Sequence, residues 1–97
     1  MLISLKNTSD YKLKFESQAE KYLKKLVIKD KKTASIILKA IREILNDPYN
    51  SDMMKGNKKG VRKKKQGDYR ILFKINNNVN PAEIRIYIVG HRKNVYK

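Results

Sequence analysis

The sequence has 97 residues and a formal net charge of +15, because 24 lysines and arginines face only 9 aspartates and glutamates. Hydrophobic residues make up 40% of the sequence, too many for a chain kept disordered by its charge. We therefore expect a single domain spanning residues 1–97, with residues 1–10 as a lead-in segment and one modest core.

The positive charge is concentrated in the second half of the chain. Residues 1–52 contain 11 cations and 7 acids, whereas residues 53–97 contain 13 cations and only 2 acids. Repulsion within such a segment destabilises the folded state unless a partner neutralises it. Nucleic acid, an anionic membrane and an acidic protein are the three classes of partner that this pattern favours.

Several kinds of site are excluded by composition. There is no cysteine, and the lone histidine, His91, cannot by itself hold a metal ion, so we expect no disulfide, no cofactor and no metal site. The apolar opening is too short for a secretory signal, and no apolar run approaches the about 20 residues of a membrane span. The expectation is a cytoplasmic protein with no membrane partner.

The first half of the chain predicts one strand followed by two helices. The segment 11–15 alternates apolar and polar residues, as a strand does. Ser17 and Glu20 have the spacing of a capping box, which predicts a helix from Ser17 to about Leu26. Thr33 is the predicted cap of a second helix that continues to about Asn46.

The second half predicts three strands. Residues 49–59 form a predicted loop in which Met53 and Met54 are packing anchors, and Gly60 begins the next strand. The turn 66–68 leads into a strand over 69–75, with residues of odd number on the apolar face and Arg70, Leu72 and Lys74 opposite. The last strand is predicted over 83–89. Its alternation places Ile84, Ile86 and Ile88 in the core and Arg85, Tyr87 and Val89 on the opposite face.

These elements predict an α+β fold of order β-α-α-β-β-β, in which a two-helix hairpin packs on one face of a small, mainly antiparallel sheet. Each of the last two strands then carries an arginine on the face away from the helices. A run of four cations precedes this pair of strands, and His91, Arg92 and Lys93 follow it. We interpret the free face and its exit as a surface for a polyanion.

Four segments occur in a diagnostic order and spacing: Leu45-Asn46-Asp47-Pro48, Met54-Lys55-Gly56, Gly67-Asp68-Tyr69-Arg70-Ile71-Leu72-Phe73, and Val89-Gly90-His91-Arg92 with Val95-Tyr96 behind. Over about residues 13–96 the chain thereby resembles the RelE/ParE toxin superfamily of bacterial and archaeal toxin–antitoxin modules. The resemblance implies a microbial RNase-like fold and a cognate acidic antitoxin as partner.

Resemblance to the RelE-like branch implies a ribosome-dependent mRNA endoribonuclease, with the ribosome and mRNA as further partners. The nucleophile of such an enzyme is the 2′-hydroxyl of the RNA, so the protein has to supply a base, an acid and cations for the developing charge. Two alternatives stay open: a ParE-like inhibitor of DNA gyrase without nuclease activity, and an RNA- or ribosome-binding module without catalysis.

The resemblance also implies roles for individual residues. Arg70 would hold the scissile phosphate, and Arg92 would be the acid or a second phosphate clamp. Tyr96 would stack on a base or orient the 2′-hydroxyl, and Lys63 or Lys65 would be the general base. The further residues expected to contact RNA are Lys55, Arg62, Lys64, His91 and Lys93.

The register of the basic strand is an open alternative, because a slip of one residue would place Arg62 and Lys64 in the cleft instead of Lys63 and Lys65. His91 is interpreted as a structural or secondary contact rather than as the acid–base group. The central expectation is that Arg70, Arg92 and the Lys63/Lys65 pair meet in a single pocket.

Overall fold

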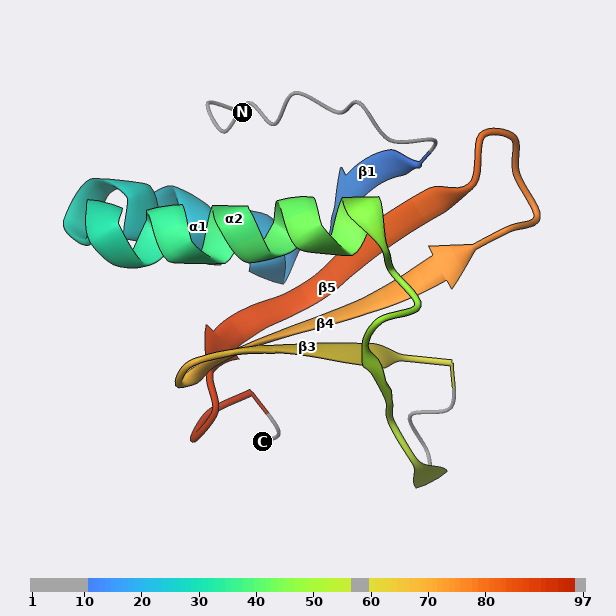
Figure 1. The fold of residues 1–97 in the computed structure, drawn as a ribbon. Coiled ribbons are helices and arrows are strands. Elements are labelled where there is room, and N and C mark those ends of the chain that lie inside the picture. Colours follow the sequence, from blue (N-terminus) through green and yellow to red (C-terminus); the bar gives the residue numbers. More distant parts are fainter. Residues whose placement is uncertain (1–10, 57–59, 96–97) are drawn as a thin grey trace.

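The computed structural model describes residues 11–56 and 60–95. In these residues two helices pack on a five-stranded sheet, and Figure 1 shows the helices side by side next to strands β1 and β5. The elements in chain order are β1 (Lys12–Phe15), α1 (Ser17–Lys29), α2 (Lys31–Asn46), β2 (Asp52–Met53), β3 (Arg62–Gln66), β4 (Tyr69–Asn76) and β5 (Glu83–His91).

The sheet has the strand order β1-β5-β4-β3-β2. Strand β1 runs parallel to β5, and the other neighbouring strands are antiparallel. Parallel neighbours need a long crossover connection, and here the chain between β1 and β5 runs through both helices and the other three strands. The predicted α+β fold, with an N-terminal strand, a helical hairpin and a mainly antiparallel sheet, is therefore confirmed.

The helix caps differ from the prediction. The side chain of Asp30, the single residue between α1 and α2, accepts hydrogen bonds from the Thr33 backbone N–H at 3.1 Å and from the Thr33 hydroxyl at 2.6 Å. Asp30, not Thr33, is thus the N-cap of α2, and these bonds lower the pKa of its carboxyl group. The capping box predicted at Ser17 was also wrong, because Glu16 occupies the N-cap of α1 and makes no side-chain capping bond. Helix α1 extends to Lys29, beyond the predicted end at Leu26.

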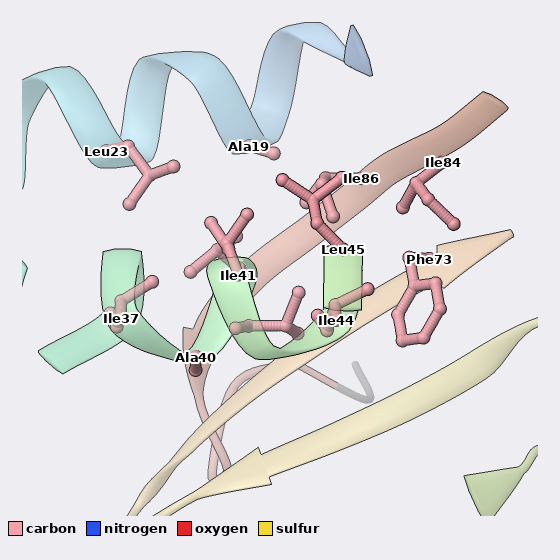
Figure 2. Close-up of a cluster of buried hydrophobic side chains, with 12 residues drawn as sticks. Ala19, Leu23, Ile37, Ala40, Ile41, Ile44, Leu45, Phe73, Ile84 and Ile86 are labelled. Carbon is pink, nitrogen blue, oxygen red and sulfur yellow. The ribbon is translucent and has the colours of Figure 1, made fainter. Parts of the chain in front are cut away.

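The core lies between the helices and the central strands. Figure 2 shows side chains of α1 and α2 directed towards Phe73 of β4 and towards Ile84 and Ile86 of β5. Helix α2 supplies the largest share because apolar residues recur along it at helical spacing. The buried core residues are Ala19, Leu23, Ile37, Ala40, Ile41, Ile44, Leu45, Ile71, Phe73, Ile84, Ile86 and Val89.

A β-bulge between β4 and β5 changes which residues of β5 reach this core. Phe73 pairs with Ile86 and Leu72 pairs with Ile88, so Tyr87 has no partner of its own in β4. Beyond the bulge the alternation is reversed, and Val89, opposite Ile71, is fully buried in the core. The prediction that Ile88 faces the core and Val89 faces outward was therefore wrong.

The predicted loop at 49–59 contains the short strand β2. Asp52 pairs with Lys63 and Met53 pairs with Arg62. Met53 is 50% exposed, so the prediction that it is a packing anchor was wrong. Strand β3 begins at Arg62 rather than at Gly60, and the connecting residues 57–59 lie outside the described part of the chain.

Candidate nucleic-acid interface

The register of β3 and β4 determines which cations point away from the helices. Ile71 and Phe73 pack in the core, so Arg70 and Lys74 project from the opposite surface. Lys65 lies directly opposite Arg70, and paired residues share a face of the sheet. By the same pairing a set of basic residues lies on this surface, which we call the cationic face: Lys12, Lys14, Lys63, Lys65, Arg70, Lys74 and Arg85.

Arg62 and Lys64 lie on the other side of β3. The Arg62 guanidinium donates to the Ser51 carbonyl oxygen at 3.2 Å and lies 5.0 Å from the centroid of the Tyr49 ring. The Lys64 ammonium is 3.1 Å from the Glu43 carboxylate of α2. The slipped register is therefore not the one adopted, and Arg62 and Lys64 alternate to the face of β3 opposite Lys63 and Lys65.

Arg70 is held at the turn between β3 and β4. Its Nη1 donates to the carbonyl oxygens of Gly67, at 2.7 Å, and of Tyr69, at 2.8 Å. The turn is possible because Gly67 has a φ of +57°, a conformation that most residues avoid. These bonds orient the guanidinium at the end of the strand, next to Lys65.

The segment after β5 brings Arg92 to the same end of the sheet. The Arg92 backbone N–H donates to the Asp68 carbonyl oxygen at 2.7 Å, and its side-chain Nε lies 3.6 Å from the Asp68 carboxylate. Val95 is buried against Gly90, which pairs with Arg70. The chain thus turns back over the cationic face, and Arg70 and Arg92 both contact the Gly67–Asp68 turn.

The remaining tail residues are less closely associated with this surface. His91 pairs with Tyr69 on the helix side, and their rings meet edge to face with centroids 5.6 Å apart. The Lys93 side chain is exposed, while its backbone N–H donates to His91 Nδ1 at 3.2 Å. Lys55 is exposed after β2, and the predicted stacking residue Tyr96 lies outside the described residues.

A shallow concavity of about 330 Å³ lies beside β3. Its lining consists of Tyr49, Asn50, Ser51, Asp52, Lys63, Lys64 and Lys65. Arg70 and Arg92 do not line it, so this concavity does not bring all four cations together. Lys65 links the two regions, because it lines the concavity and is also the cross-strand neighbour of Arg70.

Asp52 is a candidate that the sequence reasoning missed. Its carboxylate lies 3.7 Å from the Lys65 ammonium, and its backbone pairs with Lys63. An ionised carboxylate accepts a proton, which an ammonium group cannot do. The signal in the sequence was a lone acid just before the Met54-Lys55-Gly56 segment, but strand pairing was needed to place it beside the lysines.

In the part of the chain that the structure describes, no helix is long and apolar enough to cross a membrane. No group of three or more histidine, cysteine, aspartate or glutamate residues is arranged to hold a metal ion within 11–56 and 60–95.

Comparisons with solved structures show what the fold resembles. The toxin–antitoxin complex RelBE2 from Mycobacterium tuberculosis contains a chain that matches with a TM-score of 0.70 and 22% identity, over 88% of this chain and 94% of that one. The YoeB/ParE toxin from Agrobacterium tumefaciens matches with a TM-score of 0.73 and 13% identity, over 82% and 96%. The YoeB dimer from Staphylococcus aureus matches with a TM-score of 0.67 and 18% identity, over 86% and 98%.

At these identities the likeness shows the fold alone. A comparison with the curated proteins gives no match. The family model described as "ParE toxin of type II toxin-antitoxin system, parDE" matches residues 11–96, which is most of the chain. The chain therefore belongs to the ParE toxin family of type II toxin–antitoxin systems, within the RelE/ParE superfamily.

Proposed function

We propose that this toxin is an mRNA endoribonuclease that acts on translating ribosomes and binds its substrate on the cationic face. The observation that carries the proposal is the alignment of Lys63, Lys65 and Arg70 on one surface, with Lys65 directly opposite Arg70. Like charges at such a position destabilise a sheet, and the phosphates of RNA would neutralise them.

The proposed reaction is transesterification within the RNA. The 2′-oxygen attacks the adjacent phosphorus as its proton passes to a base, and the bond from phosphorus to the 5′-oxygen breaks. The departing 5′-oxygen takes up a proton, which leaves a 2′,3′-cyclic phosphate and a 5′-hydroxyl end. The scheme needs no redox step and no metal ion.

Residues on and beside the cationic face suit the separate tasks. Arg70 and Arg92 would bind the phosphate and stabilise the charge that develops on it. Asp52 would accept the 2′-hydroxyl proton, and the Lys65 ammonium, 3.7 Å from that carboxylate, would donate a proton to the 5′-oxygen. The open shape of the concavity gives the protein little means to align a free RNA by itself, which is why the ribosome is part of the proposal.

A cognate antitoxin is the proposed regulatory partner. The matching chain of the RelBE2 structure belongs to a toxin–antitoxin complex, and the family is defined by such modules. An acidic polypeptide that covers the cationic face would neutralise its charge and block RNA access together.

The second candidate function is inhibition of DNA gyrase. The matching family model describes ParE toxins, and this match favours gyrase inhibition. This function requires a binding surface but none of the proton transfers described above.

One pair of assays separates the two functions. The toxin is added to ribosomes translating a defined mRNA and, in parallel, to DNA gyrase acting on relaxed plasmid. The proposal predicts mRNA cuts in phase with codons and unchanged supercoiling. Intact mRNA together with gyrase inhibition would replace the proposal with the second candidate.

A further inference from the structure

The β-bulge in β5 leaves Tyr87, an aromatic residue on the cationic face, without a partner of its own in β4. Tyr87 is the extra residue between Ile86, which packs in the core opposite Phe73, and Ile88, which pairs with Leu72. Its ring lies 5.4 Å, centroid to Nζ, from the ammonium group of Lys74. Because Lys74 projects from the surface opposite the helices, Tyr87 lies there too.

Lys74 differs from its cross-strand neighbour Arg85 in its ion pairs. Arg85, which pairs with Lys74 across the strands, is engaged by the carboxylates of Glu16 at 2.8 Å and Glu83 at 3.0 Å. Lys74 is exposed and forms no ion pair within the described residues. Its charge is therefore available to an external anion, and the Tyr87 ring beside it is only half-buried.

We propose that Tyr87 and Lys74 form a nucleotide-binding subsite of the toxin. A base of single-stranded RNA stacks on the Tyr87 ring, in the place that the Lys74 ammonium takes in the free protein, and Lys74 binds an adjacent phosphate. A nucleotide carries both a flat ring and an anion, so it matches both side chains. The inference rests on the proposed function, because it takes the cationic face to be the RNA-binding surface.

The position of the subsite follows from the strand. Lys74 is four residues along β4 from Arg70 on the same face, which corresponds to about 13 Å. The subsite therefore binds the RNA to one side of the scissile phosphate rather than at it. It would position the substrate and take no part in proton transfer.

The test is the affinity of the free toxin for short 2′-O-methyl oligouridylates, measured by fluorescence anisotropy. These probes cannot be cleaved because the nucleophilic hydroxyl is blocked. One probe carries all its bases and a second, of the same length, carries abasic sugars. Wild-type toxin should bind the probe with bases more tightly, since stacking requires the base.

Tyr87→Ala should weaken binding of the probe with bases by about 5-fold or more and leave the abasic probe almost unaffected. Tyr87→Phe, which keeps the ring and removes the hydroxyl, should bind like the wild type. Lys74→Ala should weaken both probes equally, and Lys39→Ala, an exposed lysine on α2, should weaken neither. Thermal unfolding of each variant reports any loss of structure.

Equal affinities of wild-type toxin and Tyr87→Ala for the probe with bases would overturn the subsite, as would a loss that is the same for both probes. This result is independent of cleavage. If the toxin cuts mRNA on ribosomes but Tyr87→Ala binds normally, the subsite fails and the proposed function stands. If base-dependent binding requires Tyr87 but no mRNA is cut, the subsite stands and the nuclease fails.

Discussion

Lys65 and Arg70 lie directly opposite each other on β3 and β4, so two positive charges occupy one cross-strand pair. Each side chain also contacts other groups. The Lys65 ammonium lies 3.7 Å from the Asp52 carboxylate, and the Arg70 guanidinium donates hydrogen bonds to the Gly67 and Tyr69 carbonyl oxygens. The repulsion between them is reduced but not removed. A bound phosphate would convert this unfavourable pair into a favourable three-charge arrangement.

The alternation of lysines on β3 predicts a difference between neighbouring residues. Lys63→Ala and Lys65→Ala should each reduce the salt dependence of binding to single-stranded RNA by about 0.7 in the slope of log K against log salt concentration, because each removes one phosphate contact. Lys64→Ala is the matched control, since Lys64 pairs with Glu43 on the helix side. Titrations at several potassium chloride concentrations measure the slopes, and equal slopes for all three variants would contradict the assignment.

Asp52→Asn should separate catalysis from binding. The amide cannot accept the 2′-hydroxyl proton, so cleavage on ribosomes should fall about 10²- to 10⁴-fold. Removing a negative charge from the cationic face should leave the affinity for a 2′-O-methyl oligonucleotide unchanged or higher. Asp47→Asn, an exposed acid at the end of α2, serves as the control. Normal cleavage by Asp52→Asn would exclude Asp52 as the base.

Gly90 is predicted to be required for the turn that carries Arg92. A Cβ atom added at Gly90 would lie 3.1 Å from Val95 Cγ2, which is tighter than ordinary contact. Gly90→Ala should therefore lower the free energy of unfolding by about 1 kcal/mol or more, as overpacking does. Val95→Ala in the same chain should restore part of this loss, as measured by urea denaturation. Strictly additive effects of the two substitutions would show that the contact is not the cause.

The carboxyl group of Glu83 should make stability depend on pH. Glu83 is 5% exposed, and its pKa is lowered chiefly by the hydrogen bond from Arg85, with further contributions from the charges of Arg85 and Lys14. A lowered pKa in the folded state stabilises the protein above the unfolded pKa of about 4.3, and this stabilisation is lost as the pH falls through the folded value.

Glu83→Gln should therefore destabilise the protein at neutral pH and reduce the loss of stability on acidification below about pH 5. Glu43→Gln, which removes the partner of a partly exposed ion pair, should have less effect than Glu83→Gln at either pH. Thermal unfolding at a series of pH values measures both. A Glu83→Gln curve parallel to that of the wild type would contradict the assignment.

Periodicity was sufficient to predict most of the fold. The helical spacing of Ile37, Ile41 and Ile44 placed α2 on the sheet, and the alternation over β4 placed Arg70 outside the core, as the structure confirms. The alternation over β5 failed after Tyr87, at Ile88 and Val89, because a bulge inserts one residue into the pairing and leaves no signature in a single strand's sequence.

Prediction of the site depended more strongly on knowing which strands pair and in which register. An uninterrupted basic run has no apolar residues to mark its faces, so only pairing with β4 distinguishes Lys63 and Lys65 from Arg62 and Lys64. Asp52 was missed for a related reason: β2 is two residues long, too short for a periodic pattern. The cap of α2 was predicted wrongly for a local reason: Asp30, three residues before Thr33, accepts the hydrogen bond from the Thr33 backbone N–H.

The most direct measurement of the central claim is the rate at which the Arg70→Ala toxin cleaves mRNA on translating ribosomes, relative to the wild type and to Arg42→Ala on the exposed surface of α2. If the cationic face binds the scissile phosphate, Arg70→Ala should cut about 10²- to 10³-fold more slowly at unchanged thermal stability, and Arg42→Ala should cut normally. Cleavage by a folded Arg70→Ala toxin at the wild-type rate would contradict the account.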